Sequence, residues 1–359
     1  MALRIGVVGV GFGTTVHVPA FQSEGIEVAA ICARRPERAE EAAARFSIER
    51  ACTDWEELVA AEDLDALSIV TPTAMHHPIA LAALRAGKHV ILEKPFAMNT
   101  AEAKELAAEA AASGRTAMIA HEFRFASARM RAKELIEQGY LGELRLGLLK
   151  LLRDPGARGE PAPFRPDRDV AAARSGFLFS LGSHYIDCLR HFFGEVEAVS
   201  GELMTLSPER SEGGGVVLSD ADDSFMFRLY FASGGVAEMV ASRQTPGVST
   251  SSIELFGSEG TLVTPQEGMN PPPHGTLLGA RRGEGPLQQL DIPERLEPFA
   301  DERDERLMPF RLFTRKFLRG IAEGSSPAPN FDDGYACQQI LDALYESSAR
   351  GSRVAIAPR

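Results

Sequence analysis

The chain has 359 residues, of which 44% are hydrophobic and 25% are charged, and its formal net charge at pH 7 is −12. This length and balance predict a soluble globular protein with two domains, and no stretch is apolar over the length of a membrane span. The negative charge argues against nucleic-acid binding, which needs cations that neutralise phosphates. The 4 cysteines are widely spaced and form no CxxC pair, so we expect reduced thiols in a cytoplasmic protein.

Short apolar runs alternate with Ala-rich amphipathic segments in the first part of the chain. The expected strands are residues 3–10, 26–32, 64–70, 89–93 and 116–120. Strands that alternate with crossover helices form a parallel sheet, so we predict an α/β domain over residues 1–121. Asp54 with Glu57, and Asn99 with Glu102, have the spacing of capping boxes, which predicts a helix start at both places.

The pattern changes after residue 140, where the apolar runs are longer and helical segments are fewer. Residues 144–152, 225–243 and 252–263 favour strands of an antiparallel or mixed sheet. We therefore assign residues 122–359 to a second domain of the α+β class.

Four further segments of this second domain have clear local patterns. Residues 207–222 and 265–303 are rich in Gly, Pro and charge, and we expect long loops there. Residues 304–324 and 332–351 have helical patterns that end on glycine, as helices often do.

Three glycines follow the first predicted strand in the segment RIGVVGVGFGTTVH. A glycine-rich turn between a strand and a helix lets the backbone approach a pyrophosphate and directs the positive helix end at it. Threonine occupies the third glycine position of the G-x-G-x-x-G pattern, and a plain tight turn is the alternative. The turn lies at the first strand–helix junction, so we predict a dinucleotide-binding loop. Its residues are Gly9, Gly11, Phe12, Gly13 and Thr14.

The end of the second predicted strand indicates which dinucleotide is bound. NAD-binding domains usually have an acidic residue there that holds the ribose 2′-hydroxyl, but this position is Ala33. Arg34 and Arg35 follow, and guanidinium groups suit a 2′-phosphate. We therefore expect NADP, with NAD as the alternative if both arginines are only solvated at the start of the next helix.

The run HVILEKP ends on Glu93, Lys94 and Pro95. Ligands of a doubly wound sheet lie outside the carboxyl ends of its strands, so we expect Lys94 at the cofactor crevice. Pro95 restricts the backbone of Lys94 to extended conformations, which directs the lysine side chain. The alternative is a surface lysine paired with Glu93.

Several motifs together resemble the Gfo/Idh/MocA family, which includes glucose-fructose oxidoreductase and inositol dehydrogenase. They extend over nearly the whole chain and are GVGFGTTVH, TPTAMHHPIALAALRAGKHVILEKPFAMN, HEFRF, SLGSHYIDCLRHFFG, FGSEGTL and DDGYACQQILDALYESSARGSRV. The resemblance implies an N-terminal Rossmann domain and a C-terminal domain with a large, mostly antiparallel open sheet. It also implies a homodimer or homotetramer.

The resemblance assigns roles to single residues. Lys94 falls on the family's catalytic lysine, which contacts both cofactor and substrate. Arg124 matches an arginine at the domain junction. Apart from the resemblance, Arg124 and Arg165 are candidates for binding an acidic or phosphorylated sugar, with the stabilisation of loops as the alternative. The residues expected to line the cofactor are Thr71, Pro72, His76 and Glu93.

Residues 181–193 have the pattern of a helix with an apolar face, and Ser180, His184, Asp187 and His191 recur along another face. The family's Asp-x-x-x-His motif falls on Ser180 and His184, which makes His184 the catalytic acid–base and Asp187 a ligand of a substrate hydroxyl. A histidine that is only structural is the alternative. Ser180 replaces the usual aspartate, and a neutral hydroxyl favours the imidazolium less than a carboxylate does.

These observations predict an NAD(P)-dependent oxidoreductase that interconverts a secondary alcohol and a ketone on a sugar or polyol. His184 would move the hydroxyl proton, and Lys94 would stabilise the developing oxyanion. The alternatives are a glycosidase that oxidises its substrate transiently with bound NAD, and a non-catalytic dinucleotide-binding or regulatory protein, which Ser180 keeps open. We expect no metal, since only His184 with Asp187 has the spacing of ligands.

Overall fold

The computed structural model describes residues 2–156, 161–266 and 270–358. The chain divides into two compact units: unit 1 is Met1–Glu122 with Asp301–Gln338, and unit 2 is Phe123–Ala300 with Gln339–Arg359. Residues 301–338 therefore pack with unit 1, whereas the sequence analysis placed them in the second domain. Among the described residues, no helix is both long and apolar enough to cross a membrane.

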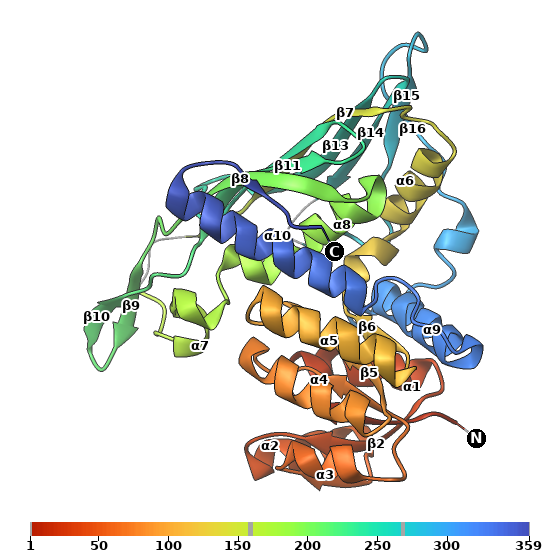
Figure 1. Cartoon of the computed structure of the whole chain (residues 1–359), viewed down its shortest axis with the longest axis vertical. Helices are drawn as coiled ribbons and strands as arrows, with labels where there is room; N and C mark the ends of the chain where they lie inside the picture. Colours follow the sequence, from red (N-terminus) through yellow and green to blue (C-terminus); the bar gives the residue numbers. More distant parts are fainter. Residues whose placement is uncertain (1, 157–160, 267–269, 359) are drawn as a thin grey trace. The chain divides into compact units, whose positions relative to one another are not determined.

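Unit 1 contains a six-stranded sheet in which every neighbouring pair is parallel. The strand order is β3-β2-β1-β4-β5-β6. Of these strands, β2, β5 and β6 are labelled in Figure 1. The strands are β1 (Arg4–Val8), β2 (Glu27–Cys32), β3 (Arg50–Cys52), β4 (Ala66–Ile69), β5 (His89–Leu92) and β6 (Ala117–Ile119). The parallel sheet is confirmed, but β3 was not predicted, because it contains a charged residue and only one buried side chain and so forms no apolar run. The order reverses between β1 and β4, and ligands of such sheets bind beyond the carboxyl ends at this point.

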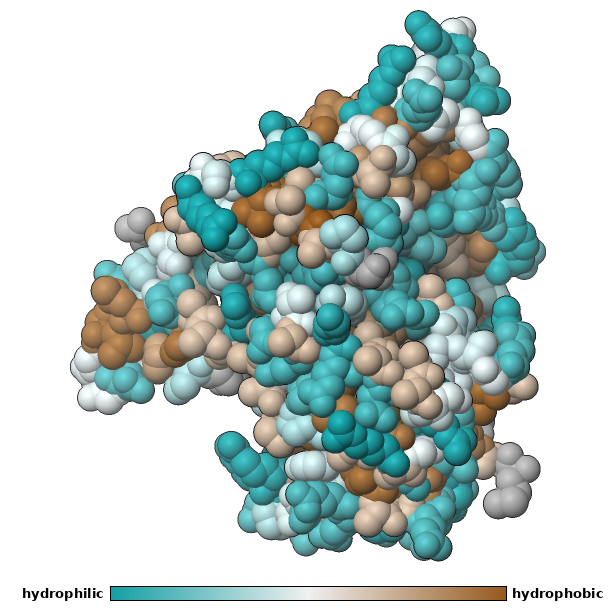
Figure 2. All heavy atoms as spheres, in the orientation of Figure 1, coloured by the Kyte–Doolittle hydropathy of each residue, from teal (hydrophilic) through white to brown (hydrophobic). Residues whose placement is uncertain are grey.

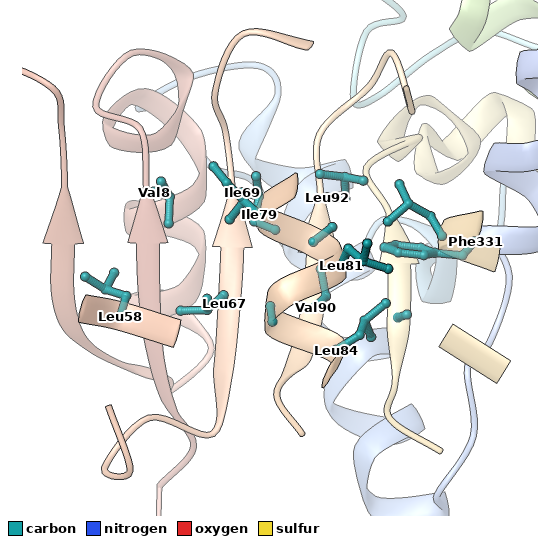
Figure 3. Packing of buried hydrophobic residues seen from close by; sticks show 14 of the residues in the cluster. Val8, Leu58, Leu67, Ile69, Ile79, Leu81, Leu84, Val90, Leu92 and Phe331 are labelled. Carbon is teal, nitrogen blue, oxygen red and sulfur yellow. The ribbon is translucent and has the colours of Figure 1, made fainter. Parts of the chain in front are cut away.

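The helices of unit 1 are α1 (Val18–Ser23), α2 (Pro36–Phe46), α3 (Trp55–Ala60), α4 (His76–Arg85), α5 (Thr100–Ser113), α9 (Leu307–Glu323) and the first part of α10 (Phe331–Arg350). Residues of α3, α4 and α5, together with Phe331 of α10, form one apolar cluster with the sheet. Figure 3 shows Ile79 of α4 next to Ile69 of the sheet, and Leu81 of α4 next to Phe331. Each fully buried side chain of this kind contributes about 1.5–3 kcal/mol, so the cluster holds the strand ends in place.

The predicted helix starts are observed, with one difference in detail. The Asn99 carboxamide accepts the N–H of Glu102 at 3.0 Å, and the Glu102 carboxylate accepts the N–H of Met98 at 3.0 Å. This reciprocal pair caps α5. At α3 the Asp54 carboxylate accepts from the N–H of Glu56, at 2.9 Å, and not from Glu57.

Unit 2 contains a nine-stranded sheet of order β16-β15-β14-β13-β7-β12-β11-β8-β17. Its strands are β7 (Leu144–Leu152), β8 (Val196–Met204), β11 (Ser224–Phe231), β12 (Val236–Ser242), β13 (Thr250–Gly257), β14 (Gly260–Gln266), β15 (Leu278–Arg281), β16 (Gln288–Gln289) and β17 (Val354–Ala355). All pairs are antiparallel except β7 with β12, so the mostly antiparallel sheet is confirmed.

The two predicted loops of unit 2 are partly wrong. The first contains a separate hairpin of β9 (Glu209–Glu212) and β10 (Gly215–Leu218), and the second contains β15 and β16. Gly213 and Gly214 connect β9 to β10 with φ of 57° and 81°, as a two-residue hairpin turn requires. These two adjacent glycines are therefore the sequence signal of the hairpin turn. Hydrophobic side chains gather on this hairpin in Figure 2, where Val216 is 60% exposed.

The helices of unit 2 are α6 (Ser127–Glu137), α7 (Pro166–Asp169), α8 (Ser183–Phe193) and the second part of α10. A π-helical turn, Leu178–Gly182, leads directly into α8. The N–H of Leu178 is held by the Asp222 carboxylate at 2.7 Å, which also accepts the hydroxyl of Tyr345 at 3.1 Å. The predicted helix is confirmed, but its polar stripe is largely inside, since His184 and Asp187 are buried.

Candidate active site

The glycine loop follows β1 and approaches β4 closely. Gly9 has a φ of +119°, and its N–H donates to the Cys32 carbonyl at 2.8 Å. A Cβ on Gly9 would lie 2.2 Å from the Val70 carbonyl oxygen, so only glycine fits without movement. The Thr14 hydroxyl donates to the Val10 carbonyl at 2.7 Å, which closes the loop onto the helical turn that starts at Gly13.

Two single variants, Gly9→Ala and Gly11→Ala, distinguish an effect on folding stability from an effect on dinucleotide binding. We expect Gly9→Ala to lower the free energy of unfolding by about 2 kcal/mol, because it adds a strained φ and a backbone clash. Gly11 has no atom within 4 Å of an added Cβ, so Gly11→Ala should unfold like the wild type but bind dinucleotide less tightly. Denaturant titration and NADH or NADPH fluorescence measure the two effects. A stable Gly9→Ala variant, or tight binding by Gly11→Ala, would contradict this account of the loop.

Other residues at the same sheet edge fit a bound dinucleotide. The Thr71 hydroxyl oxygen, just beyond β4, is buried and has no hydrogen-bond partner among the described residues. Gly11 leaves open space above the loop, and Phe12 lies under the guanidinium of Arg306, 5.0 Å from ring to Cζ. A glycine turn with open space above it, and an unpaired buried hydroxyl at the same edge of the sheet, suit a phosphate-containing ligand.

The turn after β2 carries the residues expected at the adenosine ribose. Ala33 is buried and donates its N–H to the Cys52 carbonyl at 3.1 Å. Arg34 and Arg35 are exposed, and Arg35 immediately precedes the first turn of α2. Within the described ranges neither arginine side chain has a hydrogen bond or an ion pair.

Glu93 is held inside unit 1 by a histidine that the sequence analysis did not single out. His17 Nε2 lies 3.0 Å from Glu93 Oε1, and His17 Nδ1 lies 2.7 Å from the Ser68 hydroxyl. The other Glu93 oxygen accepts the N–H of Lys94 at 3.1 Å. Burial by itself would raise the pKa of Glu93, but the His17 hydrogen bond and the charges of His17 and Lys94 lower it overall. Glu93 therefore fixes the backbone at Lys94.

His76 joins the two loops that flank Lys94. Its ring nitrogens lie 2.8 Å from the Pro95 carbonyl and 2.9 Å from the Thr71 carbonyl. Burial lowers the pKa of His76, which favours the neutral imidazole. Pro72 precedes the 3₁₀ turn that leads into α4. His76 therefore connects the loop after β4, which carries Thr71 and Pro72, to Pro95, the residue that follows the half-buried Lys94.

A second carboxyl that the sequence analysis missed lies beyond β6. Glu122 is 3% exposed, and its atom Oε2 has no hydrogen-bond partner among the described residues. Burial and the nearby charge of Glu93 raise the pKa of Glu122 to about 8. The residue stands in the motif HEFRF, but no pattern of spacing showed that its carboxyl is buried.

In unit 2, two predicted substrate ligands bind each other. Arg124 Nε donates to Asp187 Oδ2 at 2.6 Å, and Nη2 donates to Oδ1 at 2.5 Å. Both side chains are at most 5% exposed. This bidentate pair connects the turn before α6 to α8 and uses both oxygens of Asp187.

His184 lies on α8 with its ring stacked on Phe123, at 3.9 Å between centroids and 11° between planes. It is 2% exposed. The Ser180 hydroxyl, on the π-helical turn, donates to the Phe177 carbonyl at 3.3 Å. Arg165 is exposed, and its N–H donates to the Asp169 carboxylate at 2.8 Å, so its backbone starts α7.

The predicted site residues divide between the two units. Lys94 and the residues expected at the cofactor belong to unit 1, whereas Arg124, Arg165, Ser180, His184 and Asp187 belong to unit 2. In unit 1 most of them follow the carboxyl ends of the parallel strands. In unit 2, His184 and Asp187 lie on α8, and Ser180 lies on the turn before it. In the described part of the chain, no group of three or more His, Cys, Asp or Glu side chains is arranged to hold a metal ion.

Two family models match the sequence. One, described as "Oxidoreductase family, NAD-binding Rossmann fold", matches residues 3–121, and the other, the GFO/IDH/MocA C-terminal domain, matches residues 130–263. With the doubly wound sheet and glycine loop described above, they define an oxidoreductase with an NAD-binding Rossmann fold. More particularly, the chain belongs to the Gfo/Idh/MocA family.

Characterised relatives resemble the chain over nearly its full length. Levoglucosan dehydrogenase of Pseudarthrobacter phenanthrenivorans is 30% identical, covering 98% of this chain and 97% of its own. Myo-inositol 2-dehydrogenase of Thermotoga maritima is 27% identical, covering 95% and 96%. Among solved structures, levoglucosan dehydrogenase in complex with NADH and L-sorbose has a TM-score of 0.89 at 28% identity, covering 100% of both chains. A complex of levoglucosan dehydrogenase with NADH and levoglucosan has a TM-score of 0.88.

Proposed function

We propose that this protein is an NAD(P)-dependent dehydrogenase or reductase that interconverts a secondary alcohol and a ketone on a sugar or polyol. The observation that carries the proposal is the half-buried Lys94 at the carboxyl end of β5, with its backbone fixed by Glu93 and a glycine loop on the same sheet edge. Relatives named as sugar and inositol dehydrogenases support the substrate class.

The chain's own residues would divide the work as follows. The nicotinamide, when bound, accepts or supplies the hydride. The Lys94 ammonium stabilises negative charge on the reacting oxygen, and His184 takes up or returns the hydroxyl proton. The Thr71 hydroxyl and the Gly9–Thr14 loop hold the cofactor. Phe123, stacked on His184, keeps the imidazole plane in one orientation.

A fluorescence titration with NADH and NADPH, followed by a panel of neutral, acidic and phosphorylated sugars and polyols, tests the proposal. Dinucleotide binding together with a change in nicotinamide absorbance on at least one member of the panel is the expected result. Tight binding without turnover on every substrate would instead indicate a regulatory protein. Sustained cleavage of a glycoside without net absorbance change would indicate a glycosidase.

For the cofactor we propose NADP in preference to NAD. Exposed Arg34 and Arg35 support this, since neither has a partner in the described part of the chain and Ala33 offers no carboxylate to a 2′-hydroxyl.

Replacing both arginines with Ala is expected to weaken NADPH binding by roughly 10- to 100-fold, because charge-assisted hydrogen bonds to the 2′-phosphate are lost. NADH binding should change little. Dissociation constants from fluorescence, with Arg38→Ala on the adjoining helix as the matched control, check the result. Equal loss for both dinucleotides would contradict an assignment to the 2′-phosphate.

A further inference from the structure

Glu122 and Lys94 both lie just beyond the carboxyl ends of strands in the parallel sheet of unit 1. β6 pairs with β5 in parallel register, with Ile119 opposite Leu92, so Glu122 and Lys94 follow neighbouring strands at the same edge. The carboxyl is 3% exposed, and Oε2 has no hydrogen-bond partner among the described residues. A buried polar atom without a partner is costly, and native proteins mostly keep such atoms where a ligand or a reaction uses them.

Three charged groups surround this carboxyl, and none forms an ion pair with it in the described part of the chain. They are Glu93 at the end of β5, Lys94 beside it and Arg306 just before α9. Burial dominates, and together with Glu93 it raises the pKa of Glu122 to about 8. The carboxyl therefore keeps its proton at neutral pH and is a hydrogen-bond donor.

We propose that Glu122 binds the nicotinamide end of the dinucleotide by donating its carboxyl O–H to the carboxamide oxygen. This inference rests on the proposed dinucleotide-dependent function. The phosphate loop follows β1, and the strand order places β4, β5 and β6 on the side of β1 away from the ribose-binding turn after β2. The nicotinamide end is expected on that side, beyond the switch point. A buried neutral acid suits an uncharged amide acceptor and needs no counter-ion.

Binding measurements on two variants test the proposal. The probes are the reduced dinucleotide that the wild type binds and the matching ADP-ribose or 2′-phospho-ADP-ribose, which lacks nicotinamide. Glu122→Ala should weaken binding of the reduced dinucleotide roughly tenfold, the effect of one hydrogen bond, and leave the ribose probe unchanged. Glu122→Gln keeps a donor and should bind nearly as tightly as the wild type. Glu105→Gln, at an exposed position of α5, controls for the exchange of a carboxyl for an amide.

The pH dependence distinguishes a donor from a structural carboxyl. Wild-type affinity for the reduced dinucleotide should fall as the pH rises through about 8, because the ionised carboxylate has no proton to donate. Glu122→Gln should lack this fall, whereas the ribose probe should show none with either protein. Equal loss of both probes in Glu122→Ala, no loss of either, or the same alkaline fall in Glu122→Gln would overturn the inference. A wild type that binds neither NADH nor NADPH would instead overturn the proposed function.

Discussion

Lys94→Met is expected to lower kcat by about 10²- to 10⁴-fold, with little change in the dissociation constant for dinucleotide. Methionine keeps the length of the side chain but supplies neither a positive charge nor a proton, and loss of such a group at a developing oxyanion costs about this much. The backbone at Lys94 should stay in place, because Glu93 holds the N–H of Lys94 and not its ammonium.

Steady-state kinetics and fluorescence titration on the same preparation check this result. Lys104→Met, on the exposed side of α5, is the matched control and should behave like the wild type. Should turnover and affinity fall together, Lys94 would be an anchor of the cofactor. Should neither fall, the reaction centre would lie elsewhere.

Asp187→Asn is expected to lower the free energy of unfolding by about 3–5 kcal/mol, because it leaves the Arg124 guanidinium buried without its counter-ion. The pair is bidentate, and both side chains are at most 5% exposed. The double variant Arg124→Met with Asp187→Leu should recover most of the loss, since two apolar side chains replace two buried charges. Guanidinium titrations measure all three proteins.

The exposed pair of Glu134 with Arg295 provides the control within the same unit. Glu134→Gln should cost less than about 1 kcal/mol, because solvent screens surface pairs. If Asp187 were mainly a substrate ligand, Asp187→Asn would unfold like the wild type and raise only KM. That outcome would support the role that the resemblance gives to Asp187.

Regular repetition made much of the fold predictable from the sequence. Apolar runs located the strands of the parallel sheet except β3, and the spacing of Asn99 and Glu102 located the start of α5. The glycine loop was recognisable because its conformation demands glycine at Gly9. Each of these features depends on residues close together in the chain.

The features that could not be predicted from the sequence depend on contacts between residues far apart in the chain. Arg124 and Asp187 are 63 residues apart, and His17 and Glu93 are 76 apart, so neither contact leaves a local pattern. The burial of Glu122 likewise depends on the whole packed edge of the sheet. The β9–β10 hairpin lies in a stretch whose composition predicts a loop, and its adjacent glycines are the local sign of the turn.

The order of strands in unit 1 has a practical consequence for redesign in biocatalysis. Arg34 and Arg35 follow β2, whereas Lys94 follows β5, and β1 and β4 lie between these strands. With neighbouring strands about 4.8 Å apart, roughly 14 Å separates the two positions along the sheet. On the roles proposed above for Arg34, Arg35 and Lys94, a transplanted β2–α2 turn offers a way to match the enzyme to a host's coenzyme supply while its chemistry is left intact.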